Sequence, residues 1–196
     1  MAGDPRDTIL TAIGQSVSVK QLIQADEVLL ETISTVAVRC SDALSRGNKI
    51  MFCGNGGSAA DAQHLAAELS GRFYYDRPPL AAVALTVNTS FLTAVANDYS
   101  FDEVFARMVK SIGNQGDVLI GLTTSGNSEN VIRAMQLAQV MNILAIGLTG
   151  KDGGKIAASS DYLIRVPSTD TPRIQESHIL IGHILCEIIE KSMFPE

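Results

Sequence analysis

The sequence predicts an α/β fold in which helices cover both faces of a parallel sheet. Five short apolar runs are each flanked by Gly, Asn, Asp or Ser, and a helical pattern follows most of them: Ile50–Cys53, Ala81–Thr86, Val118–Leu122, Ile143–Leu148 and Tyr162–Val166. Continuously apolar strands that alternate with helices are typical of parallel sheets buried on both faces. Helical patterns of apolar residues also occupy both ends of the chain.

The two end regions predict long helices. Residues 5–46 carry apolar positions at helical spacing and no proline after Pro5, which predicts one or two helices that end at Gly47-Asn48. A last helix, from about 173 to 192, is apolar on nearly every side and should therefore be buried on more than one side. We expect these helices to form a layer between subunits.

Length and composition favour one globular domain that associates with itself. The 196 residues suit a single domain over residues 1–196, with residues 1–46 contributing to oligomer contacts. The chain is 46% hydrophobic and only 18% charged, which leaves apolar surface for subunit contacts. A net charge of −6 without a Lys/Arg block argues against nucleic-acid or anionic-membrane partners.

The sequence favours a cytoplasmic protein. Its first ten residues lack the apolar region of a secretory signal, and no apolar run reaches the 18 residues that a membrane span needs. Cys40, Cys53 and Cys186 are odd in number and widely separated, which is typical of reduced, buried thiols and not of a disulfide framework.

Ligands of open parallel sheets bind beyond the carboxyl ends of the strands, so the loops after the predicted strands are the candidate sites. The first loop is Gly54-Asn55-Gly56-Gly57-Ser58, where Ser58 could cap the next helix. A dinucleotide site would need an acidic residue at the end of the next strand, and that strand ends in Thr-Val-Asn. A Walker-type phosphate loop is absent too. The glycine loop alone leaves a tight turn and a phosphate contact equally open.

The loop after the third predicted strand is a stronger phosphate candidate. Residues 123–130 read TTSGNSEN, and four hydroxyl side chains gather within six residues: Thr123, Thr124, Ser125 and Ser128. Hydroxyls and backbone N–H groups at a helix start suit a phosphate dianion without Lys or Arg. Asn97-Asp98-Tyr99 forms another polar break, which by itself indicates a turn.

Two pairs of residues could carry acid–base or metal chemistry. His64 and Glu68 lie four residues apart on the helix after the glycine loop, so they share one face. Gln175 and His183 lie on the last helix, roughly 12 Å apart along its axis. His183 stands among Ile and Leu and needs a partner for its ring nitrogens, unless it is a satisfied core histidine.

Five stretches occur in the order and spacing of one enzyme family: CGNGGSAADAQHLAAE, AVANDYS, LTTSGNSENV, LTGKDGG and RIQESHILIGHI. Over essentially its full length the chain resembles the phosphoheptose isomerases, whose core is the sugar isomerase (SIS) domain. The resemblance implies a flavodoxin-like three-layer α/β/α sandwich on a five-stranded parallel sheet. It also implies a homotetramer with active sites between subunits, and conversion of sedoheptulose 7-phosphate to D-glycero-D-manno-heptose 7-phosphate for lipopolysaccharide precursors.

The resemblance also implies roles for particular residues. Glu68 and His183 would be the acid–base pair, and one zinc ion per subunit would be held by four ligands: His64, Glu68, Gln175 and His183. The substrate would be bound by three sets of residues, of which the hydroxyls hold the phosphate: Asn55, Gly56, Gly57 and Ser58; Asn97 and Asp98; and Thr123, Thr124, Ser125 and Ser128. Glu68 and Gln175 would also contact the substrate.

A sibling group on the same domain does no isomerisation. The DiaA-type tetrameric adaptors bind the replication initiator DnaA and share CGNG, AND and RIQE with this chain, but they lack the acid–base pair. Glu68 and His183 therefore favour the isomerase over the adaptor, and also over a sugar-phosphate sensor without catalysis. Thr123 stands where many isomerases have Ser, which keeps the hydroxyl and adds a methyl group.

Overall fold

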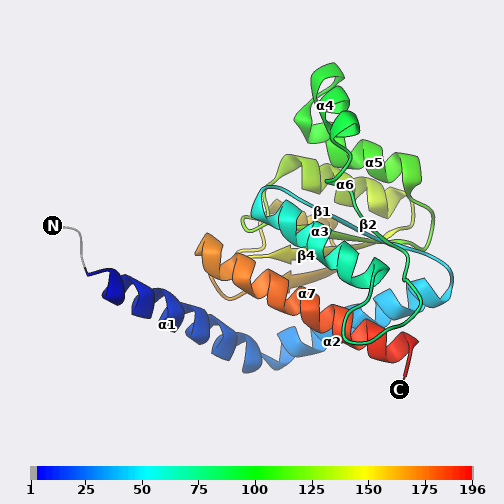
Figure 1. Ribbon diagram of the computed structural model, residues 1–196. Helices are drawn as coiled ribbons and strands as arrows, with labels where there is room; N and C mark the ends of the chain where they lie inside the picture. The colour runs from blue at the N-terminus through cyan, green and yellow to red at the C-terminus, as the bar shows by residue number, and fades with distance from the viewer. Residues whose placement is uncertain (1–3, 196) are drawn as a thin grey trace.

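The computed structural model describes residues 4–195 and is an α/β fold with two long helices before the first strand (Figure 1). Its elements are, in chain order, α1 (Pro5–Gln24), α2 (Glu27–Ser45), β1 (Ile50–Gly54), α3 (Gly57–Ser70), β2 (Ala82–Ala84), α4 (Thr89–Asp98), η1 (Phe101–Glu103), α5 (Val104–Ile112), β3 (Val118–Leu122), α6 (Glu129–Val140), β4 (Leu144–Thr149), η2 (Lys155–Ser159), β5 (Tyr162–Arg165) and α7 (Thr171–Met193). The predicted domain of residues 1–196 includes residues 1–3 and 196, which lie outside the described residues.

The five strands form one parallel sheet in the order β2-β1-β3-β4-β5, which is the flavodoxin-like order. The chain leaves β1 for β2 on one side and then crosses to β3 on the other, so the strand order reverses between β1 and β3. Cys53 pairs with Gly121 and Gly54 pairs with Leu122. This register places the loops after β1 and β3 side by side at the carboxyl edge of the sheet.

Helices cover both faces of the sheet, as predicted. The buried side chains of α1, α2, α3 and α7 form one core with one face of the strands, and those of α4, α5 and α6 form a second core with the other face. Figure 1 shows α5 and α6 above the strands, while α3 crosses in front of the strands with α7 beside it. The three-layer sandwich is thereby confirmed.

Most predicted boundaries agree with the structure to within two residues. The apolar run 81–86 is shortened most, because only Ala82–Ala84 pairs as an edge strand. The N-terminal region divides into two helices at Asp26, whose carboxylate accepts a hydrogen bond from the Leu29 amide at 3.0 Å and so caps α2. The expectation that Ser58 caps α3 is wrong, since Gly56 is the cap residue and Ser58 lies inside the helix, where it is buried.

Apolar side chains remain exposed along α1, which projects from the sandwich (Figure 1). Ile9, Leu10, Ile13, Val17 and Leu22 are each about half exposed or more. None of the helices in residues 4–195 has both the length and the hydropathy to cross a membrane. The three cysteines are free and buried, as expected, and burial raises the pKa of each thiol to about 12.

Candidate active site

The glycine loop turns the chain sharply from β1 into α3. Gly56 has a φ of +57°, which side chains rarely adopt, and it occupies the cap position of α3 without a side-chain capping bond. A Cβ on Gly54 would lie 2.8 Å from the Cβ of Ser58, so this glycine lets the first turn of α3 pack against the strand end. The loop therefore presents backbone groups of residues 55–57 at the edge of the sheet.

Asn55 joins this loop to the start of α6. Its side-chain amide and that of Asn130 exchange two hydrogen bonds of 2.9 Å each, and Asn130 is buried. Asn130 also accepts a hydrogen bond from the Val131 amide through its Oδ1. Asn130 was not selected from the sequence, although it closes the hydroxyl-rich stretch. The reciprocal pair holds the two candidate loops in fixed relation.

The hydroxyl-rich loop packs against the loop after β4. Thr123 Oγ1 and Ser128 Oγ lie 3.0 Å apart, and Ser128 is the cap residue of α6. A Cβ on Gly126 would lie 2.1 Å from the carbonyl oxygen of Gly153, so the two backbones touch directly. Thr123 is buried, Thr124 and Ser128 are half-buried, and Ser125 is exposed. The four predicted phosphate residues are therefore gathered at one helix start.

His64, Glu68 and His183 form one compact cluster between α3 and α7. His64 Nε2 lies 2.9 Å from His183 Nε2 and 3.2 Å from Glu68 Oε1. One ligand atom from each residue falls within 4.8 Å of the others. The Phe73 ring flanks His183 at a centroid separation of 5.7 Å. No sequence signal pointed to Phe73, because it belongs to the irregular segment after α3.

A glycine on α7 permits this close approach of the two helices. A Cβ on Gly182 would lie 2.5 Å and 2.6 Å from the two Cδ atoms of Leu65, which follows His64 in the chain. Gly182 and Leu65 are both buried. Gly182 directly precedes His183, and Leu65 directly follows His64. The helix contact therefore sets the distance between His64 and His183.

Gln175 lies against the glycine loop. A Cβ on Gly57 would lie 2.5 Å from Gln175 Nε2 and 3.1 Å from its Oε1. The absence of that Cβ leaves room for the amide at the first turn of α3, two helical turns from the histidine position on α7. The structure thus places Gln175 at the first turn of α3 and His183 farther along this helix, beside His64.

The other predicted residues lie apart from this cluster. Asn97 and Asp98 end α4 on the opposite side of the sheet from α7, where they are exposed and joined to each other by a 2.9 Å hydrogen bond (Figure 1). His178 is the core histidine of the chain. It is fully buried, with its Nε2 3.2 Å from the Thr149 carbonyl oxygen, and burial lowers its pKa to about 4.

The His64–Glu68–His183 cluster suits a zinc ion. Two imidazole nitrogens and a carboxylate oxygen are common zinc ligands, and the three point to one place. Neutral imidazoles 2.9 Å apart can share only one proton between their Nε2 atoms, so a bound cation would satisfy both nitrogens at once. The Gln175 amide oxygen is chemically able to complete the set.

Comparison with known proteins assigns the chain to a family. Residues 16–150 match the model of the SIS domain. The chain is 52% identical to the phosphoheptose isomerase of Aneurinibacillus thermoaerophilus over 188 residues, which cover 96% of this chain and 95% of that protein. It is 59% identical to the phosphoheptose isomerase of Nitratiruptor over 160 residues, 82% of this chain and 86% of that one.

A solved structure agrees with these sequences. The phosphoheptose isomerase of Neisseria gonorrhoeae superposes with a TM-score of 0.89 at 46% identity, over 96% of this chain and 100% of that one. Sequence, fold and the clustered side chains lead to the same assignment: the chain belongs to the phosphoheptose isomerase family of SIS-domain proteins.

Proposed function

We propose that this protein converts sedoheptulose 7-phosphate to D-glycero-D-manno-heptose 7-phosphate, for lipopolysaccharide precursor synthesis. The observation that carries the proposal is the convergence of Glu68 and His183, from two helices, at one partly exposed position between α3 and α7. The sequence identities of 52% and 59% to proteins named phosphoheptose isomerase support the proposal.

The reaction moves a proton between C1 and C2 of the open-chain sugar through an enediol. In our proposal Glu68 takes the proton from C1 while His183 donates a proton to the C2 oxygen, which gives the enediol. Glu68 then delivers the proton to C2 while His183 takes the proton of the C1 hydroxyl, which gives the aldose and restores both residues. The 3.2 Å contact from Glu68 to His64 orients the carboxylate toward the cluster. Glu68 and His183 are both partly exposed, so a sugar can reach them from solvent.

His64, Glu68, Gln175 and His183 would hold one zinc ion per subunit. When bound, zinc would polarise the sugar carbonyl and stabilise the negative charge of the enediolate. Coordination weakens a carboxylate as a base, so we propose that Glu68 alternates between ligand and base.

The remaining substrate contacts come from the loops at the carboxyl edge of the sheet. The hydroxyls of Thr123, Thr124, Ser125 and Ser128 would hold the phosphate at the start of α6, where helix N–H groups favour an anion. The backbone of residues 55–58 would line the sugar. Asn97 and Asp98, on the other layer, would also bind the substrate.

We also propose a homotetramer in the cytoplasm, with sites completed by neighbouring subunits. The exposed apolar side chains of α1 support this assembly, because a row of half-exposed Ile, Leu and Val is costly to leave in water. The DiaA-type adaptor function is not favoured. The relatives named here are isomerases, and the acid–base pair has no use in an adaptor.

The test is direct. The purified protein, freed of metal with EDTA, is incubated with sedoheptulose 7-phosphate with and without added Zn²⁺, and the sugar is followed by NMR. We expect an aldoheptose 7-phosphate to accumulate faster with zinc. No conversion under either condition would overturn the isomerase proposal, and a pull-down of DnaA would then test the adaptor.

A further inference from the structure

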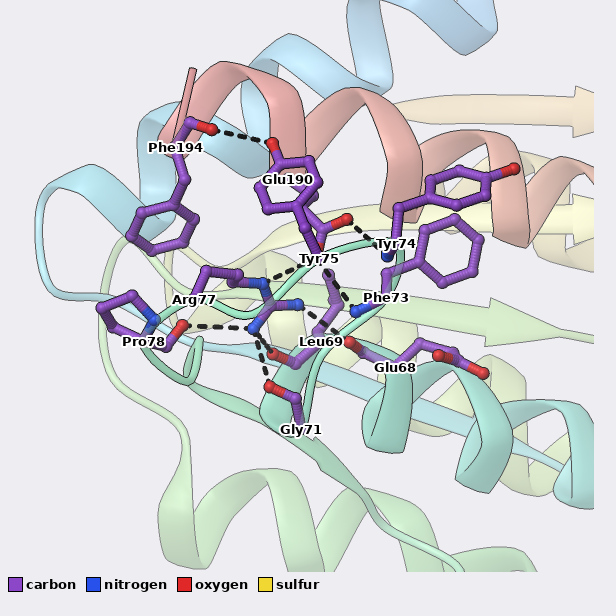
Figure 2. Close-up of polar contacts among 10 residues, drawn as sticks. All are labelled: Glu68, Leu69, Gly71, Phe73, Tyr74, Tyr75, Arg77, Pro78, Glu190 and Phe194. Atoms are coloured by element: carbon purple, nitrogen blue, oxygen red, sulfur yellow. Dashed lines mark hydrogen bonds and ion pairs between the residues drawn. The ribbon is translucent and has the colours of Figure 1, made fainter. Parts of the chain in front are cut away.

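A buried ion pair, Arg77–Glu190, lies next to the cluster and was not anticipated from the sequence (Figure 2). Arg77 Nε lies 2.9 Å from Glu190 Oε1, and the two side chains are 2% and 0% exposed. Arg77 belongs to the irregular segment after α3, and Glu190 to α7. The pair therefore connects the end of one cluster-bearing helix to the other.

Arg77 caps the C-terminus of α3 with its remaining donors. Its Nη2 donates to the Glu68 carbonyl oxygen at 2.9 Å, and its Nη1 donates to those of Leu69 and Gly71 at 2.7 Å and 3.0 Å. The last carbonyls of a helix have no partners within the helix, and they carry partial negative charge. The guanidinium thus fixes the last turn of α3, which includes Glu68.

Glu190 holds the segment that Arg77 belongs to. Its Oε1 accepts a hydrogen bond of 2.9 Å from the Phe73 amide, and its Oε2 accepts one of 2.7 Å from the Tyr74 amide. Burial by itself raises the pKa of Glu190, but these amides and Arg77 outweigh burial and lower it. The carboxylate is therefore ionised, and residues 73 and 74 are anchored to α7.

Arg77 and Glu190 each hold a residue that belongs to the cluster or contacts it. The Phe73 ring, fixed through its own amide, flanks the His183 ring at 5.7 Å. Glu68 is held at its carbonyl by Arg77 while its carboxylate faces His64 at 3.2 Å. Glu190 lies seven residues, two helical turns, after His183, so it stands on the same face of α7.

We propose that Arg77 and Glu190 are positioning residues that set the Glu68 carboxylate and the His183 ring for proton transfer. Replacing a buried ion pair with well-packed apolar groups of similar size often leaves the stability of a protein unchanged or raises it, so stability alone does not account for this pair. Its function here is geometric, since one interaction network determines the end of α3, the orientation of Phe73 and the register of α7. This proposal rests on the isomerase function proposed above.

The test compares Glu190→Gln with Asp117→Asn, a matched variant directly before β3 whose hydrogen-bond partners are Asn48, Lys49 and Asn114 and include no cluster residue. Asp117 is also buried, pairs with Lys49, and accepts hydrogen bonds from two backbone amides. Both changes replace a buried carboxylate with its amide, so both should lower thermal stability. We expect Glu190→Gln to lower kcat about tenfold or more with KM little changed. Asp117→Asn should leave kcat within about twofold.

A spectroscopic measurement separates positioning from stability and from the reaction itself. The chain has three histidines, so ¹³C-labelled histidine gives three ring signals, with His178 as the internal reference. We expect Glu190→Gln to shift the His183 signal and Asp117→Asn to leave it unchanged. An unshifted signal overturns the proposal, as does a kcat loss no larger than that of Asp117→Asn.

Phe73→Leu serves as the second variant if Glu190→Gln does not fold. It removes the ring against His183 and leaves the ion pair intact. We expect it to shift the His183 signal and lower kcat, and an unshifted signal with wild-type kcat overturns the proposal. If the wild-type protein converts no heptose phosphate, only the isomerase proposal fails. The histidine signals would still test whether Arg77 and Glu190 position the His183 ring.

Discussion

The substitution Gly182→Ala tests how the helix contact governs the active site. The added methyl group would lie 2.5 Å from Leu65 Cδ1 and 3.1 Å from Leu65 Cγ. Carbon atoms pack at about 3.5 Å or more, so the contact is short by roughly 1 Å. Leu65 is buried, and the cavity beside it has only about 10 Å³, so the side chain has little room to withdraw.

The magnitudes predict a larger loss of activity than of stability. Overpacking costs about 1–3 kcal/mol, and Gly→Ala inside a helix returns about 1 kcal/mol. The net destabilisation of about 0–2 kcal/mol corresponds to a fall in Tm of no more than about 8 °C for a chain of this size. A shift of roughly 1 Å between α3 and α7 would lower turnover by up to about a hundredfold.

The assay measures Tm by circular dichroism and kcat for sedoheptulose 7-phosphate on the same preparations. The double variant Leu65→Ala/Gly182→Ala is the control, because it removes the atoms that clash with the new methyl group. We expect the double variant to recover part of the lost turnover relative to Gly182→Ala, although Leu65→Ala alone destabilises the core. Wild-type kcat in Gly182→Ala would refute the role of this contact.

Three further predictions concern the fold, the loops and the assembly. Burial raises the pKa of Asp117, but hydrogen bonds led by those from Lys49 outweigh it and lower the pKa. Its contribution to stability is therefore present above the ordinary carboxyl pKa of about 3.9 and lost as the pH falls through the lowered value. Urea unfolding of wild type and Asp117→Asn should differ at pH 7 and converge toward pH 3, and a constant difference would contradict the assignment. Gly57→Ala should displace the Gln175 amide, weakening zinc binding in a chelator competition while the circular dichroism spectrum stays that of wild type; unchanged zinc affinity would remove Gln175 from the ligand set. Light scattering after size exclusion should give four times the 20.9 kDa chain mass, and a monomer would argue against shared sites.

The sequence was sufficient for the fold because the strands and helices carry strong local patterns. β3 spans Val118–Leu122 in both the prediction and the structure, since a buried central strand is apolar throughout and Gly116-Asp117 and Thr123-Thr124 flank it. The short β2 was overestimated, because an apolar run does not reveal where an edge strand loses its partner. The prediction that Ser58 caps α3 was wrong because Gly56, with its positive φ, occupies the cap position.

The candidate site was only partly predictable, since its residues meet through tertiary contacts. The spacing of His64 and Glu68 put them on one helix face, but nothing local placed His183 at 2.9 Å from His64. That distance depends on the Gly182–Leu65 contact. The Asn55–Asn130 exchange and the Arg77–Glu190 pair join residues 75 and 113 positions apart, which no motif or periodicity reveals.

The most direct test of the proposed acid–base pair is the turnover of Glu68→Gln and His183→Gln with sedoheptulose 7-phosphate, followed by NMR. Glu187→Gln, which changes a partly exposed carboxylate one turn beyond His183, is the matched control. We predict that both cluster variants keep the wild-type circular dichroism spectrum and lose turnover, while Glu187→Gln converts the sugar at the wild-type rate. Turnover near wild type in either folded cluster variant would contradict the assigned roles.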